Sequence, residues 1–393
     1  MSDTGNDTYV EVTHQSWFGR LGESVKGIVI GLILIPCAFV LLSWNEERSA
    51  DRSSALATAA AVVVTAQAER VDSANDGALV HVMGRAVTDD VVRDSDFGVD
   101  VNALKLVRSV EMFQWRESTT QEVKEKLGGG TETVTTTSYT REWASDLADS
   151  SAFRQPRGHE NPRVMPFFDT THLAGRVTLG AFRLPDDMVD SLDEERPVPL
   201  AQSVPAPPAE IAGRPVRIGG NEFYLGNNPD HPAVGDLRIA FTMVPPVDVS
   251  LVARQHRDTF MPYATPTGDV QLIETGLKGP EALFRTAESE NALLTWALRI
   301  VGFCLMFFGF KLTFAVIEVA ASFIPPLGWL TGGILSMVAG VLALVLSLGT
   351  IGTAWLAQRP LAAAGIGAVV LAVVAGIWLL RRRAATASPR PSS

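Results

Sequence analysis

Four long uncharged runs interrupt an otherwise polar chain. They cover residues 27–44, 293–317, 327–348 and 361–380. A helix needs about 20 apolar residues to cross a hydrocarbon layer of ~30 Å, and each run comes close to that length. The pattern therefore predicts four transmembrane helices, one ahead of a polar stretch at residues 45–291 and three behind it.

The first run is predicted to stay in the protein as an anchor. A secretory signal peptide has a shorter apolar core and ends at a small-x-small cleavage site. This run instead ends in LLSWNEER, with Trp44, Asn45 and Glu46 at that place. Aromatic and basic side chains at the ends of the runs are expected to anchor them at the membrane surfaces. The predicted anchors are Trp17, Phe18, Trp44, Trp296, Trp355, Arg381, Arg382 and Arg383.

Four spans place both termini on one side of the membrane, and flanking basic residues favour the cytoplasm for that side. The arginines directly after the last run and the basic residues before the first run follow this rule, whereas Arg48 and Arg52 argue weakly against it. The sequence thus predicts a cytoplasmic segment at 1–26, a basic cytoplasmic tail at 381–393 and a periplasmic or luminal domain at 45–291.

The polar stretch shows the period-two alternation of half-buried strands. Leu237, Ile239, Phe241 and Met243 fall on one face of DLRIAFTM. Glycine- and asparagine-rich turns separate further segments of this kind. The predicted strands are 62–70, 78–88, 104–112, 134–143, 176–184, 237–243, 249–254 and 270–274. The fold class expected is α+β, a membrane protein whose β-rich antiparallel domain is inserted between its first and second spans.

Two further segments shape this domain. Residues 196–215 hold too many prolines for a central strand, and they predict a long extended loop that either divides the domain into two lobes or leaves a single sheet. After Gly279, a proline at the first helical position starts a helix that is expected to continue into the second span.

Charge is unevenly distributed between the domain and the spans. The whole chain carries a formal charge of −10, and residues 45–291 hold 24 Lys and Arg against 38 Asp and Glu, which gives 24 − 38 = −14. This balance argues against a nucleic-acid partner. An acidic surface keeps such a domain soluble and away from anionic lipid, or it docks a basic partner. Cys37 and Cys304 both fall in predicted spans, so the domain has no disulfide.

No pattern of a catalytic or metal site occurs. The chain lacks GxSxG, HExxH, P-loop and GxGxxG motifs, and its six histidines have no ligand pairing at helical spacing. No catalytic residue, metal or cofactor is therefore expected. The aromatic residues Phe113 and Trp115 with His159 could line a ligand pocket, although such aromatics more often form core and such a histidine more often orders a turn.

Charges inside the spans are the other candidates for a function. Arg299, Lys311 and Glu318 lie in or beside the second span, where a buried charge costs roughly 2.5–3.5 kcal/mol unless it pairs or reaches the membrane surface. Lys311 either extends along its stem to that surface or pairs with Glu318 or Glu23. No chain of acidic or histidine residues follows in the other spans, which disfavours a transporter.

Glycines recur along the spans and permit close helix packing. They include Gly27, Gly31, Gly302, Gly309 and Gly340. Packing within one bundle and packing between copies in a homo-oligomer both account for them.

Eight short motifs distributed over nearly the whole chain make it resemble the transmembrane protein 43 family, also called LUMA. They are SWFGRLGESVKGIVIG at 16–31, WNEER at 44–48, NDGALVHVMG at 75–84, VEMFQWRE at 110–117, YTREW at 139–143, HENPRVMP at 159–166, GDLRIAF at 235–241 and TWALRIVGF at 295–303. Together they are specific for that family, whereas each alone is weak.

The resemblance implies a membrane organiser. Animal members sit in the inner nuclear membrane and endoplasmic reticulum, self-associate, and bind lamins and emerin; the family offers no catalytic residues to carry over. The Ala-, Gly- and Arg-rich composition suggests a bacterial source, and hence the bacterial inner membrane, where there is no lamina.

Two functions follow from these observations. The first is a non-enzymatic scaffold that interacts with the bilayer, forms a homo-oligomer and recruits unidentified membrane or envelope proteins through its polar domain. The second is a ligand- or lipid-responsive module that signals from the domain to the helices.

Overall fold

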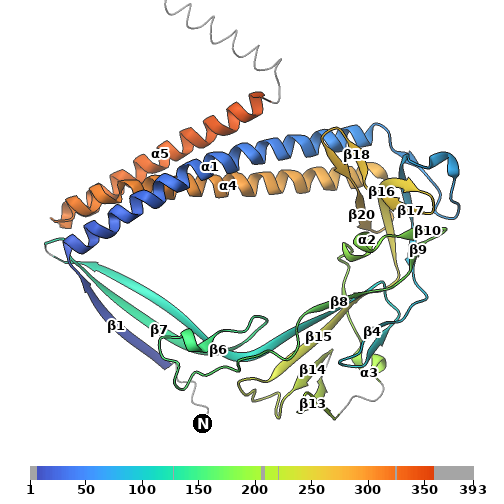
Figure 1. The fold of residues 1–393 in the computed structure, drawn as a ribbon, viewed down its shortest axis with the longest axis horizontal. Helices are drawn as coiled ribbons and strands as arrows, with labels where there is room; N and C mark the ends of the chain where they lie inside the picture. Colours follow the sequence, from blue (N-terminus) through green and yellow to red (C-terminus); the bar gives the residue numbers. More distant parts are fainter. Residues whose placement is uncertain (1–6, 127, 205–208, 220, 324, 358–393) are drawn as a thin grey trace, which may run out of the picture. The chain divides into compact units, whose positions relative to one another are not determined.

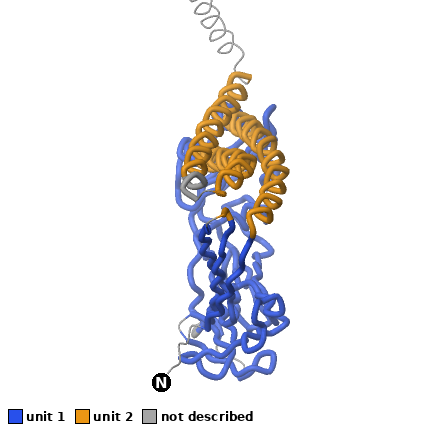
Figure 2. The backbone as a smooth tube through the Cα atoms, turned by 90° about the vertical axis from the view of Figure 1, so that its left-hand side faces the viewer, with its two compact units in different colours: residues 1–15, 54–126, 130–289 blue, residues 16–53, 127–129, 290–393 orange. Residues whose placement is uncertain are grey.

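The computed structural model describes residues 7–126, 128–204, 209–219, 221–323 and 325–357 (Figure 1). The chain divides into two compact units (Figure 2). Unit 1 comprises residues 1–15, 54–126 and 130–289, and unit 2 comprises residues 16–53, 127–129 and 290–393. Apolar helices flank a β-rich region in the sequence, so the predicted α+β membrane-protein fold class is confirmed.

Among the residues that the structure describes, three helices are long and apolar enough to cross a membrane. They are α1 (Trp17–Ala60), α4 (Pro280–Ala321) and α5 (Pro325–Ala357). All three extend beyond the predicted apolar runs, because helical hydrogen bonding continues into polar turns where hydropathy gives no signal. The expected helix after Gly279 does continue into the second span as α4. The predicted fourth span at 361–380, with Arg381, Arg382 and Arg383, lies outside the described residues.

Unit 1 is built on two large sheets. The first has the order β1-β7-β6-β15-β14-β13-β12, with β8 also pairing with β6 and β11 with β15. Its strands are β1 (Asp7–Gln15), β6 (Lys105–Glu125), β7 (Thr131–Ala144), β8 (Thr170–Leu173), β11 (Arg196–Pro197), β12 (Glu210–Ile211), β13 (Arg214–Gly219), β14 (Glu222–Leu225) and β15 (Leu237–Val244).

The second sheet has the order β2-β3-β9-β10-β17-β16-β20, with β3 also pairing with β16. Its strands are β2 (Val64–Thr65), β3 (Leu79–Val87), β9 (Val177–Leu179), β10 (Phe182–Leu184), β16 (Val247–His256), β17 (Thr259–Met261) and β20 (Leu272–Thr275). Two small hairpins, β4 (Val92–Asp94) with β5 (Val99–Val101) and β18 (Tyr263–Thr265) with β19 (Gly268–Val270), and the short helices α2 (Asp186–Asp190) and α3 (Leu200–Ser203) complete the unit.

Both sheets contribute to one hydrophobic core. Leu106 and Ile239 enter it from the first sheet, and Val82 and Leu251 enter it from the second. The alternation predicted for 237–243 is present in β15, whose residues alternate between buried and half-buried. Because one core joins the sheets, the Pro-rich stretch at 196–215 does not divide the domain into lobes; it carries α3 and short strands.

The strand predictions failed where local geometry overrides pattern. Of 62–70 only Val64–Thr65 is a strand, and 176–184 is broken into β9 and β10 by Gly180. Gly180 has φ 59°, and a Cβ at this position would overlap the backbone of Ala68. Strand β1 was not predicted. Val10 and Val12 do alternate with Glu11 and Thr13, but the stretch is short and its side chains are almost all exposed, so it has no buried face.

The end of α1 and the beginning of α4 are anchored by a second core in unit 1. Leu56 of α1 and Leu283 of α4 are fully buried beside Leu79 of β3 and Val252 of β16. The length of the apolar runs did not predict these helical turns, because the turns pack against protein instead of lipid.

In unit 2, α1 and α4 lie side by side and antiparallel (Figure 1). Glycines permit this approach: a Cβ at Gly31 would lie 2.5 Å from the carbonyl oxygen of Gly309, and one at Gly302 would lie 2.5 Å from Leu42 Cδ2. A Cβ at Gly27 would reach Leu312 at 3.6 Å, and one at Gly340 of α5 would reach Phe307 at 3.8 Å. Gly31, Gly302 and Gly309 therefore serve packing within one chain, whereas a Cβ at Gly27 or Gly340 would make only ordinary contacts.

A buried tyrosine closes the β14–β15 connection. Tyr224 Oη donates to Asp236 Oδ2 at 2.5 Å, and the same carboxylate accepts from the backbone N–H of Ala233 at 2.8 Å. Burial, and then the hydrogen bond to Asp236, raise the pKa of Tyr224 well above its usual value.

We predict that this tyrosine makes folding stability fall at alkaline pH. Because the folded-state pKa is raised, the unfolded chain loses the phenolic proton first, so the free energy of unfolding decreases as pH rises past about 10. Tyr224→Phe should be less stable than the parent near pH 8 and lose less additional stability between pH 8 and 10.5, measured by chemical denaturation in detergent. Tyr9→Phe, on exposed β1, is the control; an identical pH slope in all three proteins contradicts the assignment.

Candidate functional site

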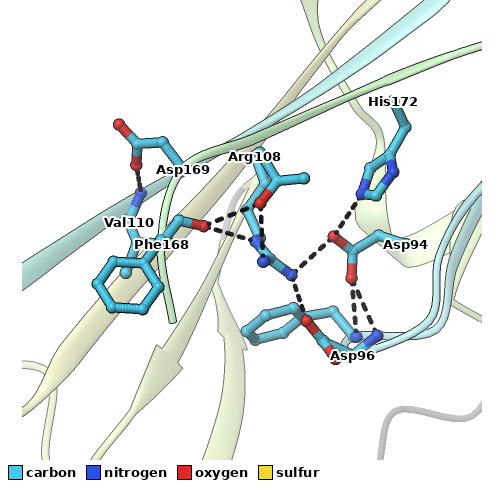
Figure 3. Close-up of polar contacts among 9 residues, drawn as sticks. Asp94, Asp96, Arg108, Val110, Phe168, Asp169 and His172 are labelled. Carbon is cyan, nitrogen blue, oxygen red and sulfur yellow. Dashed lines mark hydrogen bonds and ion pairs between the residues drawn. The ribbon is translucent and has the colours of Figure 1, made fainter. Parts of the chain in front are cut away.

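A buried cluster of charges centred on Arg108 is the first candidate site (Figure 3). Arg108 Nη1 donates to Asp94 Oδ2 and to Asp96 Oδ2, both at 2.8 Å. Asp94 has a side chain 1% exposed, and its Oδ2 also lies 3.3 Å from His172 Nε2. Strands β4, β6 and β8 thus bring together residues that are 14 to 78 positions apart in the chain.

The atoms of this cluster are engaged with one another. Asp94 Oδ1 accepts from the backbone N–H groups of Asp96 and Phe97, and Arg108 also donates to Phe168 O and to Thr170 Oγ1. The guanidinium lies 5.4 Å from the centre of the Phe97 ring. Both carboxylate oxygens of Asp94 are engaged, and these contacts fasten the β4–β5 hairpin to the large sheet.

His159 occupies a second cluster, on the outer strands of the first sheet. Its side chain is 3% exposed, stacks on Tyr139 at 3.9 Å between ring centres and meets the Trp115 ring edge-on at 4.7 Å. Nδ1 lies 2.9 Å from Gln155 O, and Nε2 lies 3.2 Å from Asp7 Oδ2 of β1.

The predicted aromatic pocket takes a different form in the structure. Trp115 and His159 do come together, but Phe113 faces Trp143 at 5.3 Å. A cleft of about 520 Å³ lies beside them, along residues 147–163. Its lining includes Ser150, Glu160, Asn161 and Arg163, and none of the three predicted residues.

A ladder of polar side chains connects α1 to α4 inside unit 2, and we name it the interhelical seam. Asn291 Nδ2 donates to Ser49 O at 2.9 Å, and Asn45 Nδ2 donates to Thr295 O at 3.1 Å. Arg48 donates to the side-chain oxygens of Asn291 and Thr295. The seam residues follow i, i+4 rows, 45–49–53 and 291–295–299, which place each row on one helix face. This spacing was the signal that sequence reasoning missed.

The seam ends in a bidentate ion pair between Glu46 and Arg299. The two hydrogen bonds measure 2.7 and 2.8 Å, and the Glu46 side chain is only 5% exposed. Arg299 also lies 4.8 Å from the centre of the Trp296 ring. A charge-assisted bidentate pair fixes geometry as well as adding energy. Arg299, predicted as an intramembrane charge, thus has its partner on α1, and Glu46 was not named as that partner.

The other predicted charges lie apart. Lys311 is exposed, and among the described residues it forms no ion pair with Glu318 or Glu23. The Glu318 carboxylate instead packs over Gly332 of α5.

The predicted membrane-interface aromatics divide into two groups. Phe18, Trp44, Trp296 and Trp355 are exposed, as lipid-facing anchors would be. Trp17 differs, because its Nε1 donates to Val319 O at 2.8 Å and so joins the start of α1 to the end of α4.

The sequence matches a described protein family over most of its length. The family model for Transmembrane protein 43 covers residues 112–360. This chain belongs to the transmembrane protein 43 family. The rat protein is 33% identical over 387 residues, or 94% of this chain and 95% of its own; the human protein is 32% identical over 365 residues, or 90% and 89%. The Drosophila melanogaster homolog is 28% identical over 372 residues, or 90% and 94%. No solved structure matches.

Membership of the transmembrane protein 43 family confirms the predicted resemblance. The chain is an integral membrane protein, and its apolar helices α1, α4 and α5 are the segments that the membrane holds. The family is named for membrane location and not for a reaction.

Replacing Arg108 with Met should destabilise unit 1 by about 3–5 kcal/mol, since it leaves buried Asp94 without its counter-charge. The measurement is the unfolding midpoint of the full chain in detergent. Arg93→Met is the matched control: Arg93 makes a bidentate pair with Asp100 in the same hairpin, but on the exposed surface, where ion pairs contribute little. An equal loss of stability in both variants would show that the buried cluster contributes no more to stability than the exposed pair.

Breaking the seam's ion pair from one side should cost more than removing it altogether. Glu46→Leu leaves the half-buried Arg299 unpaired beside an apolar side chain, with an expected loss of about 3 kcal/mol, whereas Glu46→Leu with Arg299→Leu should regain most of it because no charge is left without a partner. Unfolding midpoints of the parent, both single variants and the double variant test this. A double variant that is worse than either single variant rules out the ion-pair explanation.

Proposed function

We propose that this member of the transmembrane protein 43 family is a non-enzymatic membrane scaffold, which self-associates and recruits other proteins through its polar domain. The observation that carries the proposal is the use of its buried charges. Arg108 and Arg299 both form internal pairs with carboxylates, so in the described structure these charges hold elements in place.

Recruitment is assigned to unit 1, which holds nearly all of the polar stretch. The charge of this polar stretch, −14 from 24 basic and 38 acidic residues at 45–291, favours partners with basic surfaces. Nucleic acid is excluded as a partner by the same sign of charge. The bacterial inner membrane is the proposed location, and the partners are unidentified envelope or membrane proteins.

Self-association is assigned to α5. Gly31, Gly302 and Gly309 are engaged within the chain, whereas α5 exposes Met337, Val341 and Val345, each at least 56% exposed. These residues recur every fourth position and share one helix face. Lipid covers this face in a monomer, and a second copy covers it in a homo-oligomer.

Site-specific photocrosslinking on α5 tests self-association. A photoreactive residue at Val341, which is 56% exposed, should yield a dimer-sized product in membranes. The matched control is Ala343, two residues along the helix and fully buried, which should crosslink only within the chain. Monomer alone from Val341 would contradict self-association through this face.

Crosslinking of the full-length protein in cells, followed by affinity purification and mass spectrometry of bound proteins and lipids, tests recruitment. We expect a reproducible set of protein partners crosslinked to unit 1. No protein beyond the chain itself, together with one enriched lipid or small molecule, would contradict the scaffold function.

The cleft at 147–163 favours a second candidate, a ligand-responsive module. Glu160 and Arg163 put both signs of charge on its lining, a combination suited to a small polar ligand or headgroup. Arg163→Ala should then abolish enrichment of the bound molecule, whereas Arg157→Ala, exposed in the same loop but outside the lining, should leave it unchanged.

A further inference from the structure

The N-terminal strand β1 belongs to the same sheet as strands that follow the first apolar helix. All nine of its residues pair with β7, from Asp7 opposite Tyr139 to Gln15 opposite Thr131. Two side-chain contacts reinforce the ladder: His159 Nε2 lies 3.2 Å from Asp7 Oδ2, and Arg154 forms an ion pair with Glu11. Strand β1 is therefore an integral part of unit 1.

This pairing constrains the path of α1. The chain leaves unit 1 after Gln15, begins α1 at Trp17, and belongs to unit 1 again from Ser54, where the last turns of the same helix are buried against β3 and β16. Both ends of α1 are thus tied to one polar domain. If α1 carried the chain from one side of the membrane to the other, β1 and β7 would be in different compartments.

The sheet cannot pass through the bilayer, so β1 and β7 cannot pair across it. The β6–β7 ribbon carries charges on both strands, including Glu122, Lys124, Glu125 and Glu132, and each would cost roughly 2.5–3.5 kcal/mol in the hydrocarbon. An open sheet edge would also leave backbone groups without partners in lipid. The polar sheet must therefore lie entirely on one side.

Contacts inside unit 2 give a second, independent indication. The turn between β6 and β7 belongs to this unit, and its Gly129 O accepts from Arg20 Nη1 at 2.7 Å. A Cβ at Gly129 would overlap Trp17 and would lie 3.1 Å from Phe323 Cα, just past the end of α4. The start of α1 and the end of α4 therefore both meet a turn of the polar stretch.

We propose that α1 and α4 enter and leave the membrane on the same side as the polar domain. The N-terminal segment then shares the compartment of residues 61–279, in place of the predicted opposite side. The paired helices are embedded from one face of the bilayer over the apolar run of α1 at 27–44, which is about 27 Å long. Their partner is the hydrocarbon of that leaflet, which covers the exposed Val29, Ile33 and Val40 of α1.

Sided labelling tests this topology in the full-length chain. In a background with Cys37→Ala and Cys304→Ala, single reporters are Thr13→Cys on β1 and Thr119→Cys on β6, both exposed positions. Right-side-out and inside-out vesicles from expressing cells are treated with a membrane-impermeant maleimide. We expect both reporters to react in the same vesicle type and to be protected in the other. Reaction of the two reporters in opposite vesicle types overturns the proposal.

A disulfide pair shows that β1 occupies its place in the membrane-bound protein. Val10 lies directly opposite Thr136, so Val10→Cys with Thr136→Cys should oxidise readily in vesicles. The control pair is Val10→Cys with Thr120→Cys. These two positions are one strand farther apart, because Thr120 of β6 lies opposite Thr136 of β7. Mass spectrometry of the linked peptide reports both pairs. Oxidation of neither pair, with folded protein present, overturns the proposal as well.

Discussion

The antiparallel pairing of α1 and α4 is the constraint on which the membrane part of this protein depends. Near one end the helices are joined by the bidentate Glu46–Arg299 pair and the amide contacts of Asn45 and Asn291. Farther along, Gly31 and Gly309 let the backbones meet. In hydrocarbon, apolar side chains give little preference for one helix partner over lipid. Directional polar contacts and close backbone approach therefore select the register.

The polar unit is stabilised by the same means in a different solvent. A hydrophobic core shared by two sheets supplies most of the burial, and Arg108 with its two aspartates fixes the β4–β5 hairpin to that core. This unit has no cysteine, so buried ion pairs fix its loops, as disulfides do in many exported domains. They add conformational definition at a substantial desolvation cost, which suits a protein that presents surfaces.

Membership of the transmembrane protein 43 family, a domain with its buried charges in internal pairs, and exposed apolar helix faces fit an organising function. The N-terminal strand adds a structural reason for a one-sided attachment. Because β1 is hydrogen-bonded along its whole length to β7, the first helix is held at both ends by the domain it anchors.

Hydropathy alone determined the three described helices, the fold class and the middle strands such as β6, β15 and β16, since burial in lipid or in a sheet leaves a periodic signal in the chain. The short sequence motifs indicated the protein family. Tertiary structure alone decided the partner of Arg299, the use of the glycines within one chain, and the charge cluster of Arg108, because each joins residues distant in sequence. It also decided the place of β1, whose short, exposed stretch of sequence does not indicate that it pairs with β7.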